Sequence, residues 1–168
     1  SSTWRLADIS HQAWIDAGRP QDQDVQTLRQ IVMENVWFTG TFGQFSETAT
    51  KLPFDQHMVM GLVAPRALFV VNNTDPYWLG KESSFLGAVA GRAIWEALGI
   101  PEKMGASQVG GHAHCSNVPQ QTEEVVRYVK RFMLGDASID TSNVMYTDGG
   151  YTVDKARWMP WTVPVLSD

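Results

Sequence analysis

The chain has 168 residues, of which 43% are apolar and 18% charged, and its net charge is −5. A chain of this size can bury a core of its own, which predicts a single domain, and the acidic balance without a Lys or Arg cluster argues against nucleic acid as a partner. The sequence has no apolar run of about eighteen residues that could span a membrane, and residues 1–15 lack the basic start and apolar block of a signal peptide.

The first predicted helix follows a surface loop. Residues 1–24 have no sustained hydrophobic period, and Gly18–Pro20 marks the loop. The apolar residues of the next stretch recur at helical spacing: Val25, Leu28, Val32 and Val36. This period predicts a helix that Asp24 caps. Three polar residues share another face of this helix: Gln26, Gln30 and Glu34. A stripe of this kind is most often a solvated helix face.

The middle of the chain contains the clearest strand. Residues 39–54 are rich in Gly, Thr, Ser and Phe without a period, which predicts an irregular loop. Asp55 then starts a short helix that runs through Leu62 and is stopped by Pro65. Ala67–Val71 is a continuous apolar run, which is typical of a strand covered on both faces in a parallel sheet.

A second helix and a second strand follow. Ser83 or Ser84 can cap a helix that runs to Leu98, with Gly99 as its C-cap. Small residues would let this helix approach a sheet closely: Gly87, Ala88, Ala90 and Gly91. Residues 106–109 form a short apolar run, which predicts the second strand.

A last helix is predicted from Gln120 to Leu134, where Gly135 ends it. Its expected buried face consists of four residues at helical spacing: Val125, Tyr128, Val129 and Phe132. The tail, residues 136–168, is rich in turn residues and is predicted to pack over the domain as irregular chain.

A glycine-hinged loop, Val109–Cys115, carries two of the four histidines and the only cysteine. Gly110 and Gly111 let the backbone turn sharply after a strand, which would present an imidazole where a general base must sit. His114 is the candidate base. The alternative, favoured on the loop alone, is that His112 and His114 are turn residues bonded only to backbone. A metal site is disfavoured, because no second cluster of ligands accompanies the loop.

The order of the predicted elements is strand, loop with Asp75, helix, strand, loop with His114, helix. This alternation is typical of a parallel α/β sheet, in which sites form at the carboxyl ends of the strands. Two strands cannot make a self-sufficient sheet. We therefore predict that residues 1–168 are the C-terminal part of a larger α/β domain and are incomplete by themselves.

Longer motifs point to a family. An acid loop followed by a histidine loop is the order in which α/β-hydrolases place the last two members of their catalytic triad. Five motifs stand in order along the chain: Asn35–Phe38, Leu52–Met58, Leu62–Leu68, Asp75–Gly80 and Gly110–Cys115. Together they resemble the glucuronoyl esterases of carbohydrate esterase family 15. The resemblance spans nearly the whole chain and implies a three-layer α/β-hydrolase fold with a mostly parallel sheet.

The resemblance implies a serine-type esterase that cleaves esters between 4-O-methyl-glucuronic acid of xylan and lignin alcohols. It makes His114 the base, and it puts the serine of a Gly-Cys-Ser-Arg elbow and a triad Glu before Ser1, in a nucleophile-bearing part that this sequence lacks. Cys115 would form a disulfide with the cysteine of that elbow. Some bacterial members carry the triad acid on the loop that here holds Asp75. The alternative for Asp75 is a turn former before proline.

Three further positions match residues that contact the uronic acid in the family: Gln26, Glu34 and Trp78. The resemblance implies that Gln26 and Glu34 hydrogen-bond sugar hydroxyls and that Trp78 forms a flat wall against the ring. Gln30 has no such match and is expected to stay a surface residue.

The resemblance implies no cofactor and no metal. It predicts a monomer that is secreted or periplasmic and whose substrate is a glucuronoxylan–lignin ester. Neither a nucleic acid nor a membrane is expected as a partner. The alternative function is that of a non-catalytic fragment, or a degenerate relative, that binds plant-wall carbohydrate through its aromatic residues.

Overall fold

The computed structural model describes residues 3–20, 24–34 and 36–166. In this part of the chain a three-stranded parallel sheet has the order β1 (Leu68–Asn72), β2 (Met104–Gln108), β3 (Met145–Thr147). The predicted α/β fold and its first two strands are confirmed. The third strand was missed, because it is three residues long and lies in the tail that was predicted to be irregular. Three residues are too few to show a period.

Helices cover both faces of the sheet. On one face, α5 (Lys81–Ala97) packs against a core that includes Leu68, Met104 and Ala106. On the other face lies α6 (Pro119–Tyr128), where the ring of Tyr128 stacks on Phe69 at a centroid distance of 4.5 Å. Every residue of β2 is buried, whereas every residue of β1 is only half-buried. The layers therefore alternate as helix, sheet, helix, with β2 at the centre of the described sheet.

Gly105 of β2 allows α6 to lie close to the sheet. A Cβ at this position would collide with the phenol of Tyr128 and would lie 2.8 Å from the carbonyl oxygen of Val144. Burial raises the pKa of Tyr128 well above its ordinary value, so its hydroxyl stays protonated and donates to the carbonyl of Glu102.

The start of α5 differs from its prediction. Ser83 and Ser84 lie inside the helix, and their hydroxyls donate to the carbonyls of Gly80 and Leu79. The N-cap is Gly80, which has a φ of 61°. The end of α5 lies one residue before the predicted one, at Ala97 with Leu98 as its C-cap. Gly99, predicted as the C-cap, follows with a positive φ.

The last long helix is continuous but changes type. It begins as α6 and continues as a π-helical turn over Val129–Met133, before Gly135 ends it as predicted. Its buried face is partly polar, contrary to the prediction: Val129 is 39% exposed, while Gln121 is fully buried. The Gln121 side-chain amide donates to the carbonyls of Asn72 in β1 and Ser107 in β2, so it joins these two strands.

A helix, α1 (Trp4–Asp16), occupies a region in which no sustained hydrophobic period was recognised. Its first turn is capped from a distant part of the chain, since the carboxylate of Asp55 accepts from the backbone N–H of Trp4 at 2.8 Å and of Arg5 at 3.3 Å. The same carboxylate accepts from Gln56 N and caps α4 (Gln56–Gly61), as predicted. The sequence did not indicate α1, since the carboxylate that caps it lies 50 and 51 residues away in sequence.

The predicted helix after the first loop is shorter than expected, since α2 spans Leu28–Glu34. Asp24 does not cap it; its carboxylate instead lies 2.9 Å from Nδ1 of His11. Thr27 and Gln30 exchange the bonds of a capping box at this helix start, so Gln30 is half-buried rather than a free surface residue. Val36, expected on the buried face, is 99% exposed.

The stretch after α2 is helical rather than irregular. It forms α3 (Gly40–Gly43) and a 3₁₀ helix over Ser46–Lys51. Its aromatic residues build a second, smaller core around Leu28 with members that include Trp4, Phe38, Phe42 and Phe54.

The tail contains a short helix, α7 (Lys155–Trp158), and its last described residues lie along α5, where Leu166 N donates to the carbonyl of Ala97. No helix in the described ranges is long and apolar enough to cross a membrane.

Candidate active site

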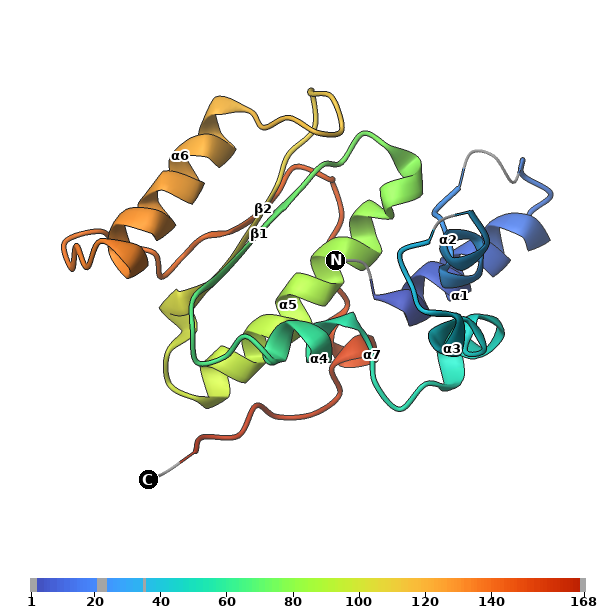
Figure 1. The fold of residues 1–168 in the computed structure, drawn as a ribbon, viewed down its shortest axis with the longest axis horizontal. Coiled ribbons are helices and arrows are strands. Elements are labelled where there is room, and N and C mark those ends of the chain that lie inside the picture. The colour runs from blue at the N-terminus through green and yellow to red at the C-terminus, as the bar shows by residue number, and fades with distance from the viewer. Residues whose placement is uncertain (1–2, 21–23, 35, 167–168) are drawn as a thin grey trace.

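The candidate site lies at one edge of the sheet, where three loops meet. Because the strands are parallel, their carboxyl ends share this edge (Figure 1). The loop after β1 carries Asn73–Trp78, the loop after β2 is the histidine loop Val109–Cys115, and the loop after β3 carries Asp148.

His112 holds the histidine loop in shape. Its Nε2 lies 2.8 Å from the carbonyl oxygen of Val109, and its Nδ1 lies 3.2 Å from the side-chain amide of Asn73. The same amide donates to the His112 carbonyl at 2.9 Å. His112 Nδ1 also lies 2.9 Å from the carbonyl oxygen of Ala113, so both ring nitrogens contact the backbone of the loop. The backbone-bonded turn residue that the alternative described is therefore His112.

His114 is placed differently, because its ring is exposed. Its Nδ1 lies 3.3 Å from Sγ of Cys115, which is also exposed. The imidazole lies against the indole of Trp78, with ring centroids 4.7 Å apart and planes inclined by 57°. A base that must meet a substrate needs this accessibility, and His112 lacks it.

Asp75 binds the histidine loop through its backbone. Its Oδ2 accepts from Gly111 N at 2.6 Å, and Gly111 has a φ of 79° that favours glycine. The contact recorded for this carboxylate is thus with the loop's main chain and not with the imidazole of His114. The assignment of Asp75 as a triad acid stays a prediction.

The sequence-based reasoning missed one residue of this edge, Asp148. Its Oδ2 accepts from Gly110 N at 2.9 Å, and its Oδ1 accepts from the hydroxyl of Thr74 at 2.8 Å. Asp148 follows the strand β3, so recognising a third strand in the sequence would have placed this carboxylate at the same edge.

The three predicted sugar-binding residues lie together. Gln26 Nε2 donates to Oε2 of Glu34 at 2.5 Å, and Gln26 N donates to the carbonyl of Trp78 at 3.1 Å. Gln26 precedes α2 and Glu34 is its last residue, so the prediction that both lie on one face of the helix was wrong. With the ring contact between Trp78 and His114, these residues form a continuous series from the end of α2 to the histidine loop. Their proposed roles toward a substrate remain predictions.

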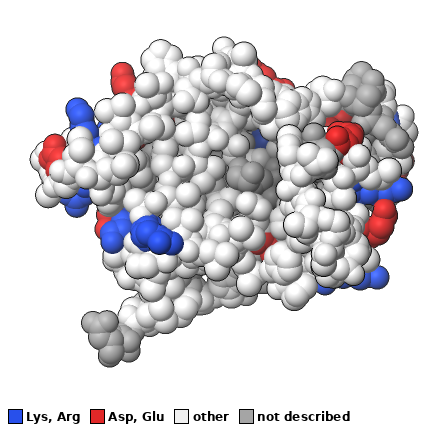
Figure 2. All heavy atoms as spheres, in the orientation of Figure 1, with Lys and Arg blue, Asp and Glu red and all other residues white. Residues whose placement is uncertain are grey.

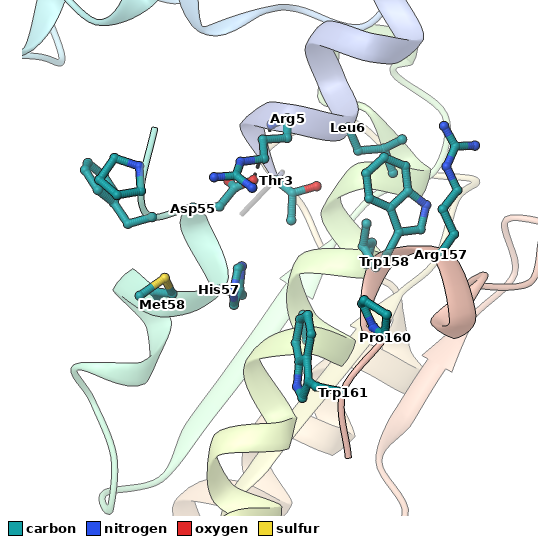
Figure 3. Close-up of a pocket in the computed structure, with 14 residues that line it drawn as sticks. Thr3, Arg5, Leu6, Asp55, His57, Met58, Arg157, Trp158, Pro160 and Trp161 are labelled. Atoms are coloured by element: carbon teal, nitrogen blue, oxygen red, sulfur yellow. Dashed lines mark hydrogen bonds between the residues drawn. The ribbon is translucent and has the colours of Figure 1, made fainter. Parts of the chain in front are cut away.

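A separate pocket of about 450 Å³ lies between α1, α4, α5 and the tail, and Figure 3 shows it. Its walls include Arg5, His57, Trp158 and Trp161. Among the described residues, Arg5 Nε and His57 Nδ1 are buried without a hydrogen-bond partner, and burial lowers the pKa of His57 despite the nearby Asp55 carboxylate. The pocket contains none of the residues predicted for the site.

Charged side chains lie mainly along the rim of the face seen in Figure 2, and its middle is largely uncharged.

Comparison with known proteins gives concordant matches. The family profile described as "Glucuronyl esterase, fungi" matches residues 2–99. The 4-O-methyl-glucuronoyl methylesterase of Hypocrea jecorina is 35% identical over 168 residues, and that of Phanerochaete chrysosporium is 40% identical over 167. These alignments cover 99% and 98% of this chain but 34% and 33% of the relatives. The chain thus spans about a third of the length of the curated relatives that it matches.

Two solved structures share the fold closely. The glucuronoyl esterase catalytic domain from Hypocrea jecorina superposes with a TM-score of 0.84 at 34% identity. A mutant of the glucuronoyl esterase from Sporotrichum thermophile, in complex with methyl 4-O-methyl-β-D-glucopyranuronate, gives 0.84 at 35% identity. Each match covers 99% of this chain and 42% of the solved chain.

Proposed function

This chain belongs to the glucuronyl esterase family, and from this we propose that it is the C-terminal part of a serine esterase domain that hydrolyses esters of 4-O-methyl-glucuronic acid. The observation that carries the proposal is the placement of His114, Trp78, Gln26 and Glu34 along one edge of a parallel sheet, in a chain 35% identical to a methylesterase of that acid. We call this chain together with the proposed nucleophile-bearing part the complete domain.

In the proposed reaction His114 moves the protons. Its imidazole takes the proton of the serine hydroxyl as that oxygen attacks the ester carbonyl. The resulting imidazolium returns the proton to the leaving alkoxide, which departs as the alcohol and leaves an acyl-enzyme. A water molecule, deprotonated by the same imidazole, then releases the uronic acid and regenerates the serine. The exposed position of His114 supports this role.

We further propose that the natural alcohol is a lignin alcohol and that the acid belongs to glucuronoxylan. This assignment rests on the resemblance of the sequence motifs to carbohydrate esterase family 15. We also propose that the complete domain is a monomer that acts outside the cytoplasm, as its resemblance to the family implies.

Hydrolysis of methyl glucuronate tests the function. We expect the complete domain to release methanol and glucuronic acid, and we expect the 168-residue chain alone to release neither, because the proposed serine is outside it. Failure of the folded complete domain to hydrolyse this ester, or hydrolysis by the chain alone, would contradict the proposal. Sugar binding without hydrolysis by the complete domain would instead favour a non-catalytic carbohydrate-binding protein.

The proposal also predicts the state of Cys115. Its side chain is exposed and adjacent to His114, where the cysteine of the serine elbow could reach it. We expect Cys115 in the complete domain to resist a thiol reagent until a reductant is added, because a disulfide with that cysteine would join base and nucleophile. Mass spectrometry of the labelled peptides measures this. Labelling of Cys115 in the folded, unreduced domain would refute the disulfide.

A further inference from the structure

Asp148 lies in the loop after β3, and its side chain contacts the loops after β1 and β2. Its carboxylate accepts from the hydroxyl of Thr74, in the loop after β1, and from the backbone N–H of Gly110, in the histidine loop. A single side chain thereby links the loops that follow all three described strands.

Asp148 is itself fixed to the sheet. Its backbone N–H donates to the carbonyl of Gln108, the last residue of β2, at 3.1 Å. The next residue, Gly149, donates to Oγ1 of Thr147 at 3.0 Å and accepts from Nζ of Lys81. The carboxylate therefore projects from anchored backbone rather than from a free loop tip.

The histidine loop has little room to move at the point where Asp148 binds it. A Cβ on Gly110 would lie 2.5 Å from Oδ1 of Asp75 and 2.5 Å from Oγ1 of Thr74. The two adjacent amides of Gly110 and Gly111 are bound by different carboxylates, Asp148 and Asp75. His114 lies three residues after Gly111, the second of these two bound glycines.

We propose that Asp148 is a positioning residue: it fixes the direction in which the histidine loop leaves β2, and so the position of the His114 imidazole. The inference deepens the proposed esterase function and rests on it. A base displaced by about 1 Å from its working position loses much of its rate without losing its proton affinity. The effect should thus fall on kcat and leave KM almost unchanged.

Two substitutions separate hydrogen bonding from charge. In Asp148→Ala both bonds are lost, and we expect kcat of the complete domain toward methyl glucuronate to fall about ten- to a hundredfold. In Asp148→Asn the amide oxygen can accept from Gly110 N, and the amide nitrogen can donate to the Thr74 hydroxyl. We therefore expect kcat of the Asp148→Asn variant to stay within about threefold of that of the unaltered domain.

Asp136 provides a matched control. Its carboxylate also accepts from a backbone N–H and a hydroxyl, both of Ser138, but entirely within its own turn. Asp136→Ala should therefore leave kcat unchanged. Equal losses of kcat in Asp148→Ala and Asp148→Asn would show that the charge of Asp148 matters rather than its hydrogen bonds to the loops. An unchanged kcat in Asp148→Ala would show that Asp148 does not position His114.

Hydrogen exchange at the Gly110 amide, followed by NMR, tests the tether without any activity. We expect this amide to exchange faster in Asp148→Ala and to keep its protection in Asp148→Asn. Unchanged protection in Asp148→Ala would overturn the proposal even in an active enzyme. If the complete domain has no esterase activity, the proposed function fails, while the exchange experiment still decides whether Asp148 holds the loop.

Discussion

In the complete domain, His114→Ala is expected to lower kcat by a factor on the order of 10⁴ or more, because the serine then has no base and the leaving alcohol has no acid. The substitution should change the fold little, since the ring is exposed and lies against the side chains of Trp78 and Cys115. KM should stay close to its original value, as the ring is not proposed to hold the sugar.

His112→Ala is the comparison that tests this assignment within the loop. His112 bonds to Val109 and Asn73 and is half-buried, so its loss should reduce the melting temperature and reduce kcat much less than His114→Ala does. Steady-state kinetics and thermal unfolding of both variants measure the two effects. Equal losses of kcat, or a larger loss in His112→Ala, would show that the base has been assigned to the wrong histidine.

Glu34→Ala is expected to reduce kcat/KM for glucuronate esters by about 1–3 kcal/mol of transition-state binding. A site that hydrogen-bonds a sugar hydroxyl rejects a substrate in which that hydroxyl is inverted, because its own polar group is left unpaired. Loss of the Glu34 carboxylate should therefore also narrow the preference for glucuronate over galacturonate esters.

The contact between Glu34 and Gln26 suggests the control. Glu34→Gln can keep a hydrogen bond to Gln26 and to a hydroxyl, so it should retain more of the preference than Glu34→Ala. Trp78→Ala should weaken the binding of glucuronate and galacturonate esters to the same extent, because a flat apolar ring does not distinguish hydroxyl stereochemistry. Kinetics on the two methyl uronates measure the ratios. An unchanged ratio in Glu34→Ala would make this residue part of a solvated helix face.

The elements that the sequence predicted well depend on neighbouring residues. The apolar run that became β1, the Asp55 cap of α4 and the glycine after α5 each act within a few positions of the element they define. The elements that were missed depend on residues that are far away in the sequence. Asp24 cannot cap α2, because its carboxylate pairs with His11, and β3 gains its hydrogen bonds from β2, some forty residues earlier.

The candidate site follows the same division. The histidine loop and Asp75 could be predicted from the order of strands and loops, but the geometry within the edge could not. The residue pattern described both histidines as backbone-bonded turn residues and did not distinguish between them. In the structure His112 bonds to the backbone of the loop, whereas the ring of His114 lies against Trp78. Asp148 could not be predicted as a site residue, because the strand β3 that precedes it was not recognised in the sequence.

The double cap formed by Asp55 has a consequence for synthesis of the chain. A ribosome makes the N-terminal end first, so α1 emerges while the carboxylate that binds its first turn does not yet exist. Uncapped amides at a helix start favour fraying, and an isolated helix of this length is marginal in water. The helix α1 therefore becomes stable only after residue 55 has been translated and has folded back, at the moment when the same side chain starts α4. Two helices on opposite sides of a fifty-residue segment thus fold as one cooperative step.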